Sequence, residues 1–334
     1  MKLRTLLPLV GLALVLALSG WSCRPAVPSR PPSPPLQSPN PFGVMLPPAL
    51  ARSPKAMVQV ARDLGVAYLR PEAIFLDRWD GSCPPCEAGL QGGLGLVLTI
   101  RNGGGPSPSM PPSDLDAYRQ HLGQVLDRYR PSLLVVENEE NSALFYSGTP
   151  EQYGQELRAA CQVAHRRGIP CTNGGLVSSL VALLVYQHYL DKGQADAARS
   201  FAARAFDPSQ REELESPLAL QQLEKGRALL AQYRAAGIDY VNFHWYIADA
   251  AALAEAVAYL REATGLPVVC NEMGQHNDDP QVTTALMEQA LSLGLPVVVW
   301  FGLDGPQARG LMEPDGTLRP TGEAFRGFLR ERFP

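Results

Sequence analysis

The sequence predicts an α/β fold, a (β/α)8 TIM barrel, over residues 42–334. Glycines repeatedly end helix-like segments, as at Gly237 and Gly265, and a near-continuous apolar run follows each time. Such runs are typical of parallel strands that are buried on both faces. Eight of them alternate with amphipathic segments, which favours a barrel. A doubly wound open sheet is the alternative, but no glycine-rich phosphate loop follows the first strand.

The expected elements follow this rhythm along the chain. A glycine in the left-handed conformation stops a helix, and Ser53-Pro54 and Ser113–Asp116 are typical helix starts. The expected strands are 42–46, 66–70, 95–100, 133–137, 169–173, 239–243, 267–271 and 296–301. The expected helices are 53–64, 113–130, 150–167, 217–236, 249–263, 280–293 and 321–332.

Two segments depart from the repeat. Residues 71–94 are poor in helix signals and contain the Cys-Pro-Pro-Cys stretch. We interpret residues 177–206 as a helical insertion after the fifth strand, in addition to the usual strand–helix repeat.

The N-terminus predicts export and a tether. Residues 1–22 combine Lys2 and Arg4 with an apolar run and small residues, which is typical of an export signal peptide. Cys23 follows as a candidate lipidation site, although Gly20 stands where lipoprotein signals usually carry Leu. Residues 23–41 form a proline-rich linker. We therefore expect an extracytoplasmic bacterial lipoprotein, held at the membrane by an N-terminal lipid anchor; simple secretion and an uncleaved anchor are the alternatives.

Export would place the cysteines in an oxidising compartment. Cys83 and Cys86 are candidates for a small loop disulfide, and Cys161 and Cys171 for a second across a helix-to-strand turn. Cys270 is then left free in a buried strand. A thioredoxin-type motif and a zinc site fit less well, because neither the flanking elements nor a second ligand pair is present.

The composition excludes several classes of function. A formal net charge of −4 gives no reason to expect a nucleic-acid partner. The sequence carries no metal-ligand cluster and no cofactor motif, so we expect no metal and no cofactor. We expect a monomer.

Polar residues gather where the predicted strands end. Six of the eight asparagines lie at or just beyond strand ends, and Trp245, Trp300 and His244 join them. In this fold the carboxyl ends of the strands meet at one mouth, where active sites are built. Amide groups and aromatic faces suit a carbohydrate, which needs fixed hydrogen-bonding partners and a flat apolar surface.

Two carboxylates stand out among these residues. Glu139 ends the fourth predicted strand in VENEEN, and Glu272 ends the seventh in NEMG. Side chains from these strands converge over the mouth of an eight-stranded ring. A pair of converging carboxylates is what glycosidic cleavage requires, one protonated and the other ionised.

The chain resembles glycoside hydrolase clan A, the retaining (β/α)8 glycosidases of which families 39 and 5 are examples. VENEEN at 136–141 is similar to the clan's Asn-Glu signature, and NEMG at 271–274 to the strand-7 signature. His244-Trp245-Tyr246 is similar to its His-x-Tyr motif. The resemblance covers residues 42 to 325.

This resemblance implies roles for individual residues. Glu139 would be the acid/base and Glu272 the nucleophile. The substrate-binding residues it implies surround them: Arg70 and Tyr246 next to the nucleophile, Asn138 at the sugar 2-hydroxyl, His244 and Trp245 in the strand-6 motif, and Trp300 under the sugar.

The fourth-strand loop departs from the clan pattern. Glu140 stands where proline is common, so Glu137, Glu139 and Glu140 crowd one loop and either neighbour is an alternative acid. The preceding Asn138 and the trailing Asn141 favour Glu139.

The sequence therefore predicts a cell-surface retaining glycosidase that acts on an oligosaccharide or polysaccharide. The alternative is a non-catalytic carbohydrate-binding lipoprotein on a decayed barrel, which would not need both carboxylates. A barrel enzyme with another chemistry is a weaker alternative, since no lysine lies at a predicted strand end.

Overall fold

The computed structural model describes residues 36, 38–46, 53–103, 108–302, 309–313 and 315–334. The predicted export signal, Cys23 and most of the proline-rich linker lie outside the described residues. The described residues all belong to one unit, Ser33–Pro334. Among them, no helix has the length and apolar character needed to span a membrane.

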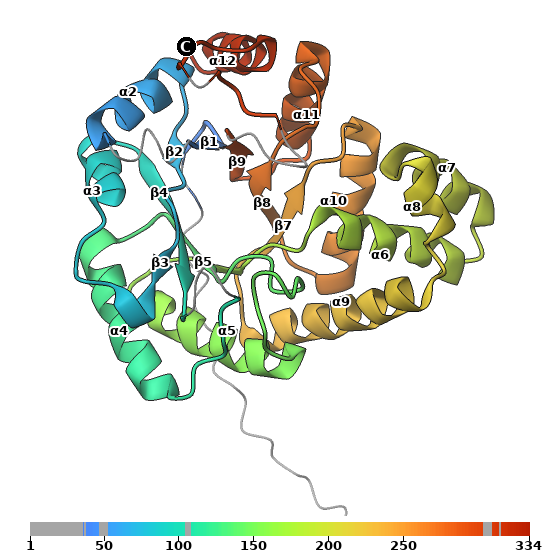
Figure 1. Cartoon of the computed structure of the whole chain (residues 1–334), viewed down its shortest axis with the longest axis horizontal. Helices are drawn as coiled ribbons and strands as arrows, with labels where there is room; N and C mark the ends of the chain where they lie inside the picture. Colours follow the sequence, from blue (N-terminus) through green and yellow to red (C-terminus); the bar gives the residue numbers. More distant parts are fainter. Residues whose placement is uncertain (1–35, 37, 47–52, 104–107, 303–308, 314) are drawn as a thin grey trace, which may run out of the picture. The chain divides into compact units, whose positions relative to one another are not determined.

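Eight parallel strands form a nearly closed barrel with helices around it (Figure 1). This confirms the predicted fold class. The strand order is β6-β5-β4-β2-β1-β9-β8-β7, and parallel bridges from Thr172 to Tyr240 and from Leu176 to Phe243 join the two ends of this path. The strands are β1 (Phe42–Met45), β2 (Tyr68–Leu69), β4 (Gly95–Arg101), β5 (Leu133–Val136), β6 (Cys171–Asn173), β7 (Val241–Trp245), β8 (Val268–Met273) and β9 (Val298–Phe301).

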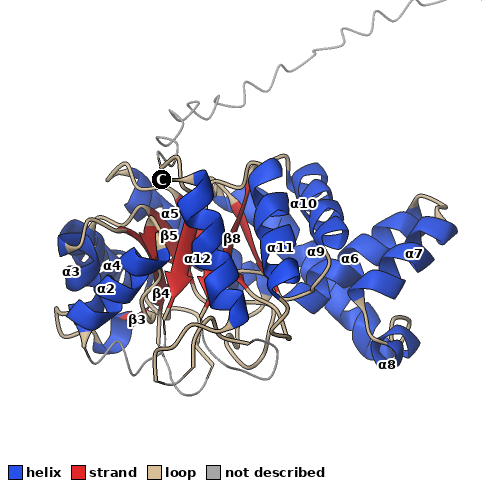
Figure 2. Cartoon of the chain, turned by 90° about the horizontal axis from the view of Figure 1, so that it is seen from above, coloured by secondary structure: helices blue, strands red, loops and turns tan. Residues whose placement is uncertain are grey.

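Helices surround the strands, as Figure 2 shows. Several begin at a polar cap, such as Thr149 before α5, and several end at a left-handed glycine, such as Gly265 after α10. The helices are α2 (Pro54–Leu64), α3 (Pro84–Gln91), α4 (Leu115–Tyr129), α5 (Pro150–His165), α6 (Ser178–Asp191), α7 (Ala195–Ala205), α8 (Pro208–Glu212), α9 (Pro217–Ala236), α10 (Ala250–Thr264), α11 (Pro280–Ser292) and α12 (Pro320–Arg332).

The segment between β2 and β4 is more regular than its sequence indicated. It forms a short strand β3 (Ile74–Phe75), a 3-10 turn η1 (Leu76–Arg78) and helix α3. The Cys83 sulfur caps α3 by accepting the Cys86 N–H at 3.3 Å, and Pro84 and Pro85 occupy the first turn. Proline is tolerated there because that N–H has no partner inside the helix. Helix α3 therefore lies in a segment whose sequence is poor in helix signals.

Between β6 and β7 the chain forms α6, α7, α8 and α9. Helices α6 and α7 extend away from the barrel beside α9 and α10 (Figures 1 and 2). Helix α8 lies at the end of the barrel where the loops after the strands gather (Figure 2).

The alternation of side chains divides the interior into two clusters. The cluster inside the ring consists of residues from the strands and the chain just before them: Tyr68, Val97, Leu133, Val135, Tyr240, Val269, Val297 and Val299. Residues on the opposite face of the strands, such as Phe42 of β1 and Trp300 of β9, pack outward against Phe325 of α12. Because successive side chains in a strand point to opposite faces, residues two positions beyond the inner cluster point into the mouth.

Two disulfides join residues that are close in sequence. One links Cys83 to Cys86, and the other links Cys161 of α5 to Cys171 of β6. Both are pairings that the sequence analysis considered. Cys270 is free and buried.

We expect loss of the Cys161–Cys171 bond to lower the free energy of unfolding by about 2–3 kcal/mol, because it closes a loop of 10 residues in the unfolded chain. The test is denaturant unfolding of a Cys161→Ala, Cys171→Ala variant. The matched control is Cys83→Ala, Cys86→Ala, which opens a loop of 3 residues and should cost less. A larger loss for the control would contradict the loop-entropy explanation.

Candidate active site

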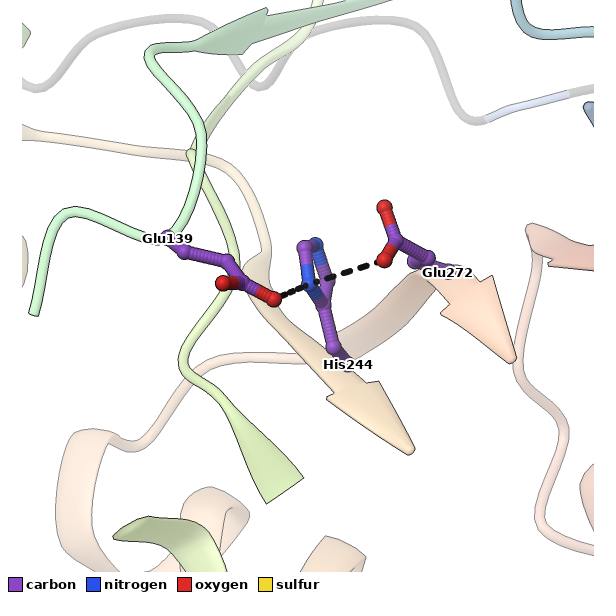
Figure 3. A group of neighbouring side chains, drawn as sticks. All are labelled: Glu139, His244 and Glu272. Atoms are coloured by element: carbon purple, nitrogen blue, oxygen red, sulfur yellow. Dashed lines mark hydrogen bonds and ion pairs between the residues drawn. The ribbon is translucent and has the colours of Figure 1, made fainter. Parts of the chain in front are cut away.

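The mouth of the barrel collects polar side chains from the ends of four strands, β2, β5, β7 and β8. Arg70 follows β2 two residues after the inner Tyr68, and His244 follows Tyr240 by four on β7. A shift in register between β7 and β8 turns Glu272 toward the same place, opposite His244. Figure 3 shows Glu139, His244 and Glu272 facing one another, with the imidazole ring between the two carboxylates.

Glu272 is held by two donors. The Arg70 guanidinium donates from Nη1 to Oε2, and the Tyr246 hydroxyl donates to Oε1 at 2.5 Å. Glu272 is only 9% exposed, and burial by itself would raise the pKa of its carboxyl. The charges of His244 and Arg70 and the two hydrogen bonds outweigh burial and lower that pKa to about 2. Glu272 is therefore ionised at neutral pH.

His244 links the two carboxylates. Its Nδ1 lies 2.8 Å from Oε1 of Glu139 and 3.6 Å from Oε1 of Glu272. The same ring's Nε2 lies 3.0 Å from Oδ1 of Asn271, which also accepts a hydrogen bond from Nδ2 of Asn242. This amide oxygen can only accept, so Nε2 carries a proton and Nδ1 faces the carboxylates. One oxygen of each carboxylate and one His244 nitrogen all lie within 4.8 Å of one another.

The environment of His244 favours its protonated form. Burial by itself would lower the pKa of this imidazole, but the negative charge of Glu272 and the hydrogen bond to Glu139 raise it above its ordinary value. Gly175 lies against the ring with a φ of +106°, and a Cβ built there would come within 2.3 Å of Nε2. A glycine at this point leaves room for the imidazole.

The loop after β5 turns only one of its three acids toward the site. Glu137 and Glu139 both have left-handed backbone, with φ of 64° and 44°. Such a conformation is costly for residues other than glycine, and it changes the direction of successive side chains. The Glu139 side chain is 16% exposed and reaches His244.

The neighbouring acids are buried elsewhere. Glu137 accepts the Asn102 N–H at 2.6 Å, and burial raises the pKa of its carboxyl to about 7. Glu140 accepts from the Tyr233 hydroxyl and from Nδ2 of Asn173 at 2.9 Å, and burial raises its pKa as well. The structure thus places Glu139, and neither of its neighbours, beside His244 and Glu272.

Arg70 also positions Asn138. Its Nη2 donates to Oδ1 of Asn138 at 2.9 Å, while its Nε lies 3.4 Å from the Thr99 hydroxyl oxygen. One guanidinium therefore ties the loop that carries Glu139 to the strand that carries Glu272. Arg70, Asn138, His244 and Tyr246 all lie at the site where the sequence predicted them.

Trp245 and Trp300 do not reach the mouth. Both are fully buried, with Trp245 against the Phe243 ring at 5.9 Å and Trp300 against the Phe325 ring at 5.6 Å. Trp300 is one residue beyond the inner Val299, so it points outward to α12. The expectation that these two residues bind substrate was therefore wrong.

Phe301, the last residue of β9, is an aromatic residue near the site that the sequence analysis did not identify. It is partly exposed, and its ring packs edge-on against Tyr246 at 5.9 Å. The alternation of Val297, Val299 and Phe301 is the signal that identifies it, since Val297 and Val299 belong to the inner cluster and Phe301 is two residues further on. Phe301 gives the site a flat apolar surface beside the Glu272 carboxylate.

Glu139, His244 and Glu272 are also the described residues whose spacing would suit a metal ion. The ion pair between Arg70 and Glu272 argues against such a site, because a second cation would compete with the guanidinium for the same carboxylate. The arrangement fits proton transfer between acids better than metal binding.

Comparison with known proteins supports this chemistry. Residues 194–325 match a family model described as the glycosyl hydrolase catalytic core. This match, over less than half of the chain, agrees with the expected resemblance to barrel glycosidases. No curated protein sequence matches this chain significantly.

Several solved structures share the fold. An exo-β-1,3-glucanase of glycoside hydrolase family 128 from Aureobasidium namibiae has a TM-score of 0.55 at 12% identity, over 86% of this chain and 96% of that one. A family 39 glycoside hydrolase from Bacteroides cellulosilyticus gives 0.56 at 14%, over 88% and 63%. A family 128 oligosaccharide-binding protein from Trichoderma gamsii gives 0.52 at 12%, over 92% and 99%. Identities this low establish the barrel fold alone.

The lowered pKa of Glu272 predicts a pH-dependent contribution to stability. A carboxyl whose pKa falls on folding stabilises the protein above its unfolded pKa, near 4.5, and loses that effect as the pH drops toward 2. We expect the stability difference between the wild type and Glu272→Gln to shrink by about 2 kcal/mol from pH 6 to pH 3. Urea unfolding at several pH values measures this, and a difference that does not change with pH would contradict it.

Proposed function

We propose that this protein is a retaining glycoside hydrolase in which Glu139 is the acid/base and Glu272 the nucleophile. The observation that carries the proposal is the pair of carboxylate oxygens within 4.8 Å of each other, with His244 between them. Retaining glycosidases hold their carboxyl groups about 5–5.5 Å apart, whereas inverting enzymes leave room for a water molecule at about 6.5–9.5 Å. The spacing of the Glu139 and Glu272 carboxylates favours direct attack of Glu272 on the anomeric carbon.

The reaction follows from the protonation states. Glu139 donates a proton to the oxygen of the scissile bond as the Glu272 carboxylate attacks the anomeric carbon, so the carbon–oxygen bond breaks and a glycosyl ester forms. The Glu139 carboxylate then takes a proton from water, and that water displaces Glu272 from the anomeric carbon. Arg70 and Tyr246 keep Glu272 ionised for the first step.

His244 supports the change of role that Glu139 undergoes. Its Nδ1 shares a hydrogen bond with Glu139 at 2.8 Å, so a proton is held between the two groups. Asn271 and Asn242 fix the ring orientation through Nε2. The protonated imidazole therefore balances the negative charge that Glu139 carries once it has given up its proton.

The substrate we propose is an oligosaccharide or polysaccharide. Enzymes described as β-1,3-glucanases, one of them in complex with laminarihexaose, share the barrel, which makes β-1,3-gluco-oligosaccharides the first substrates to test. An oligosaccharide-binding protein shares it too, so a non-catalytic binder is the competing function. A binder has no need of an ionised carboxylate held by Arg70 beside a second acid.

We also propose that the protein acts outside the cytoplasm as a lipoprotein attached through Cys23. The signal-like residues 1–22 and the proline-rich linker support this proposal. Labelling with a palmitate analogue in a bacterial host should mark the full-length protein and not Cys23→Ala. Equal labelling of both would contradict the lipid attachment.

Replacement of either carboxylate should nearly abolish turnover. We expect Glu139→Gln and Glu272→Gln to lower kcat on aryl β-glucosides or laminari-oligosaccharides by at least about 10³-fold, since each removes one chemical step. Azide should rescue Glu139→Ala, because it needs no general base. The matched control is Glu140→Gln, one residue along the loop and directed at Tyr233, which should stay within about tenfold of wild type. Wild-type activity in Glu272→Gln would contradict the nucleophile assignment.

The stereochemistry of the product tests the spacing argument directly. Double displacement releases a sugar with the configuration of the substrate. Proton NMR of the first product from a β-glycoside should therefore show the β-anomer before it equilibrates. Initial release of the α-anomer would mean that water attacks in a single step.

A further inference from the structure

Helices α6, α7 and α8 build a cavity that opens next to the carboxylate pair. The cavity has a volume of about 590 Å³, and its lining includes Ser179, Arg204, Asp207, Gln210, Tyr246 and His276. Tyr246 belongs to both places, because its hydroxyl donates to Glu272 at 2.5 Å. The cavity and the proposed active site therefore share Tyr246.

The charged side chains at this cavity already have partners within the protein. Arg204 pairs with Asp249 at 3.2 Å and with Glu255 at 3.0 Å. The Asp207 carboxylate accepts the Gln210 N–H at the start of α8. Ser179, Gln210 and Tyr246 of the lining are neutral hydrogen-bonding groups, which suits the hydroxyl groups of a sugar.

A second cavity lies beside the first and shares part of its lining. It has a volume of about 470 Å³ and shares Ser179, Phe206 and Gln210 with its neighbour. Its other lining residues include Leu180 and Leu183 of α6 and Leu214 before α9, each less than a tenth exposed. Both volumes are in the range of small-molecule sites.

The two cavities differ in the chemistry they favour. The first one, next to Tyr246, presents hydroxyl, amide and charged groups. The second has leucine and phenylalanine side chains on one part of its lining and polar residues, among them Glu212, Glu213 and Gln222, on the rest. Sugar hydroxyls would lose hydrogen bonds to water in an apolar pocket of this kind, whereas a hydrocarbon group would gain by leaving water.

We propose that the substrate is a glycoside with an apolar aglycone, whose hydrocarbon part occupies the second cavity. The inference rests on the proposed glycosidase function and adds to it the chemical class of the substrate. The polar cavity next to Tyr246 would hold the sugar portion or its linkage, and the leucine-lined cavity the alkyl or acyl portion. The helices between β6 and α9 then act as a specificity element for the barrel.

The experiment compares octyl β-D-glucoside with methyl β-D-glucoside below the micelle concentration. Binding is measured by calorimetry to the full-length Glu139→Gln variant, which does not depend on turnover, and kcat/KM is measured with the wild type. We expect the octyl glucoside to be preferred at least about tenfold in both measurements, because burial of even one or two methylene groups gives a factor of this size.

Variants assign the preference to the second cavity. Leu183→Gln makes its wall polar, and Ala219→Phe fills it without adding a polar group. We expect either change to reduce the octyl-to-methyl ratio at least about fivefold. The matched controls are Leu218→Gln and Leu220→Phe, at neighbouring positions of α9 that are 65% and 55% exposed and outside the cavity lining. They should keep the wild-type ratio.

The outcomes separate the two proposals. Equal binding of the two glucosides to Glu139→Gln, or a ratio that the cavity variants leave unchanged, would overturn the apolar-aglycone proposal even if the wild type hydrolyses oligosaccharides. Cavity-dependent octyl preference in binding, without hydrolysis of any glycoside, would support the cavity assignment and overturn the proposed glycosidase activity. Thermal melting of each variant shows that it is folded, and the two cavity variants change the pocket by opposite means.

Discussion

The ionised Glu272 is the constraint on which the rest of the site depends. A carboxylate that is nine-tenths buried is stable only if opposite charge and hydrogen-bond donors replace the water that it has lost. Arg70 at the end of β2 and His244 and Tyr246 at the end of β7 supply them. The same groups fix their neighbours, because Arg70 holds Asn138 and His244 holds Glu139. One buried charge therefore organises residues from β2, β5, β7 and β8 around a single point.

In the barrel, one part of each strand packs in the core, and the residues beyond that part form the site. Valines, leucines and tyrosines fill the ring at one level, and two to four residues further on the chain presents amide, guanidinium, imidazole and carboxylate groups. Loops beyond that level are free to vary, and the chain uses the segment after β6 to add α6, α7 and α8. Residues of these helices line a cavity whose lining also includes Tyr246, and the carboxylate pair lies outside that lining.

Much of this arrangement could be predicted from the sequence because strand ends carry a readable pattern. Apolar runs predicted all eight barrel strands, five of them preceded by a glycine junction, and an asparagine before Glu139 and before Glu272 marked both carboxylates. The sequence was less informative about which side chains of a strand point to the mouth and which point to the helices. A shift of one residue moves a side chain from the mouth to the helix layer, which is why Trp300 was chosen where Phe301 faces the site. The choice among Glu137, Glu139 and Glu140 depends on left-handed backbone at two of them, which leaves no composition signal. Helix α3 was missed because its start is a cysteine cap with two prolines.

The central claim is that the Glu272 carboxylate bonds to the sugar during the reaction. Incubation with a 2-deoxy-2-fluoro glycoside of the sugar that the wild type hydrolyses fastest, followed by peptide mass spectrometry, tests it most directly. The account predicts a fluorosugar attached to the peptide that contains Glu272, in a ratio of one per chain, and none on that peptide in Glu272→Gln. A label on the Glu139 peptide, or none during rapid turnover of the parent glycoside, would contradict it.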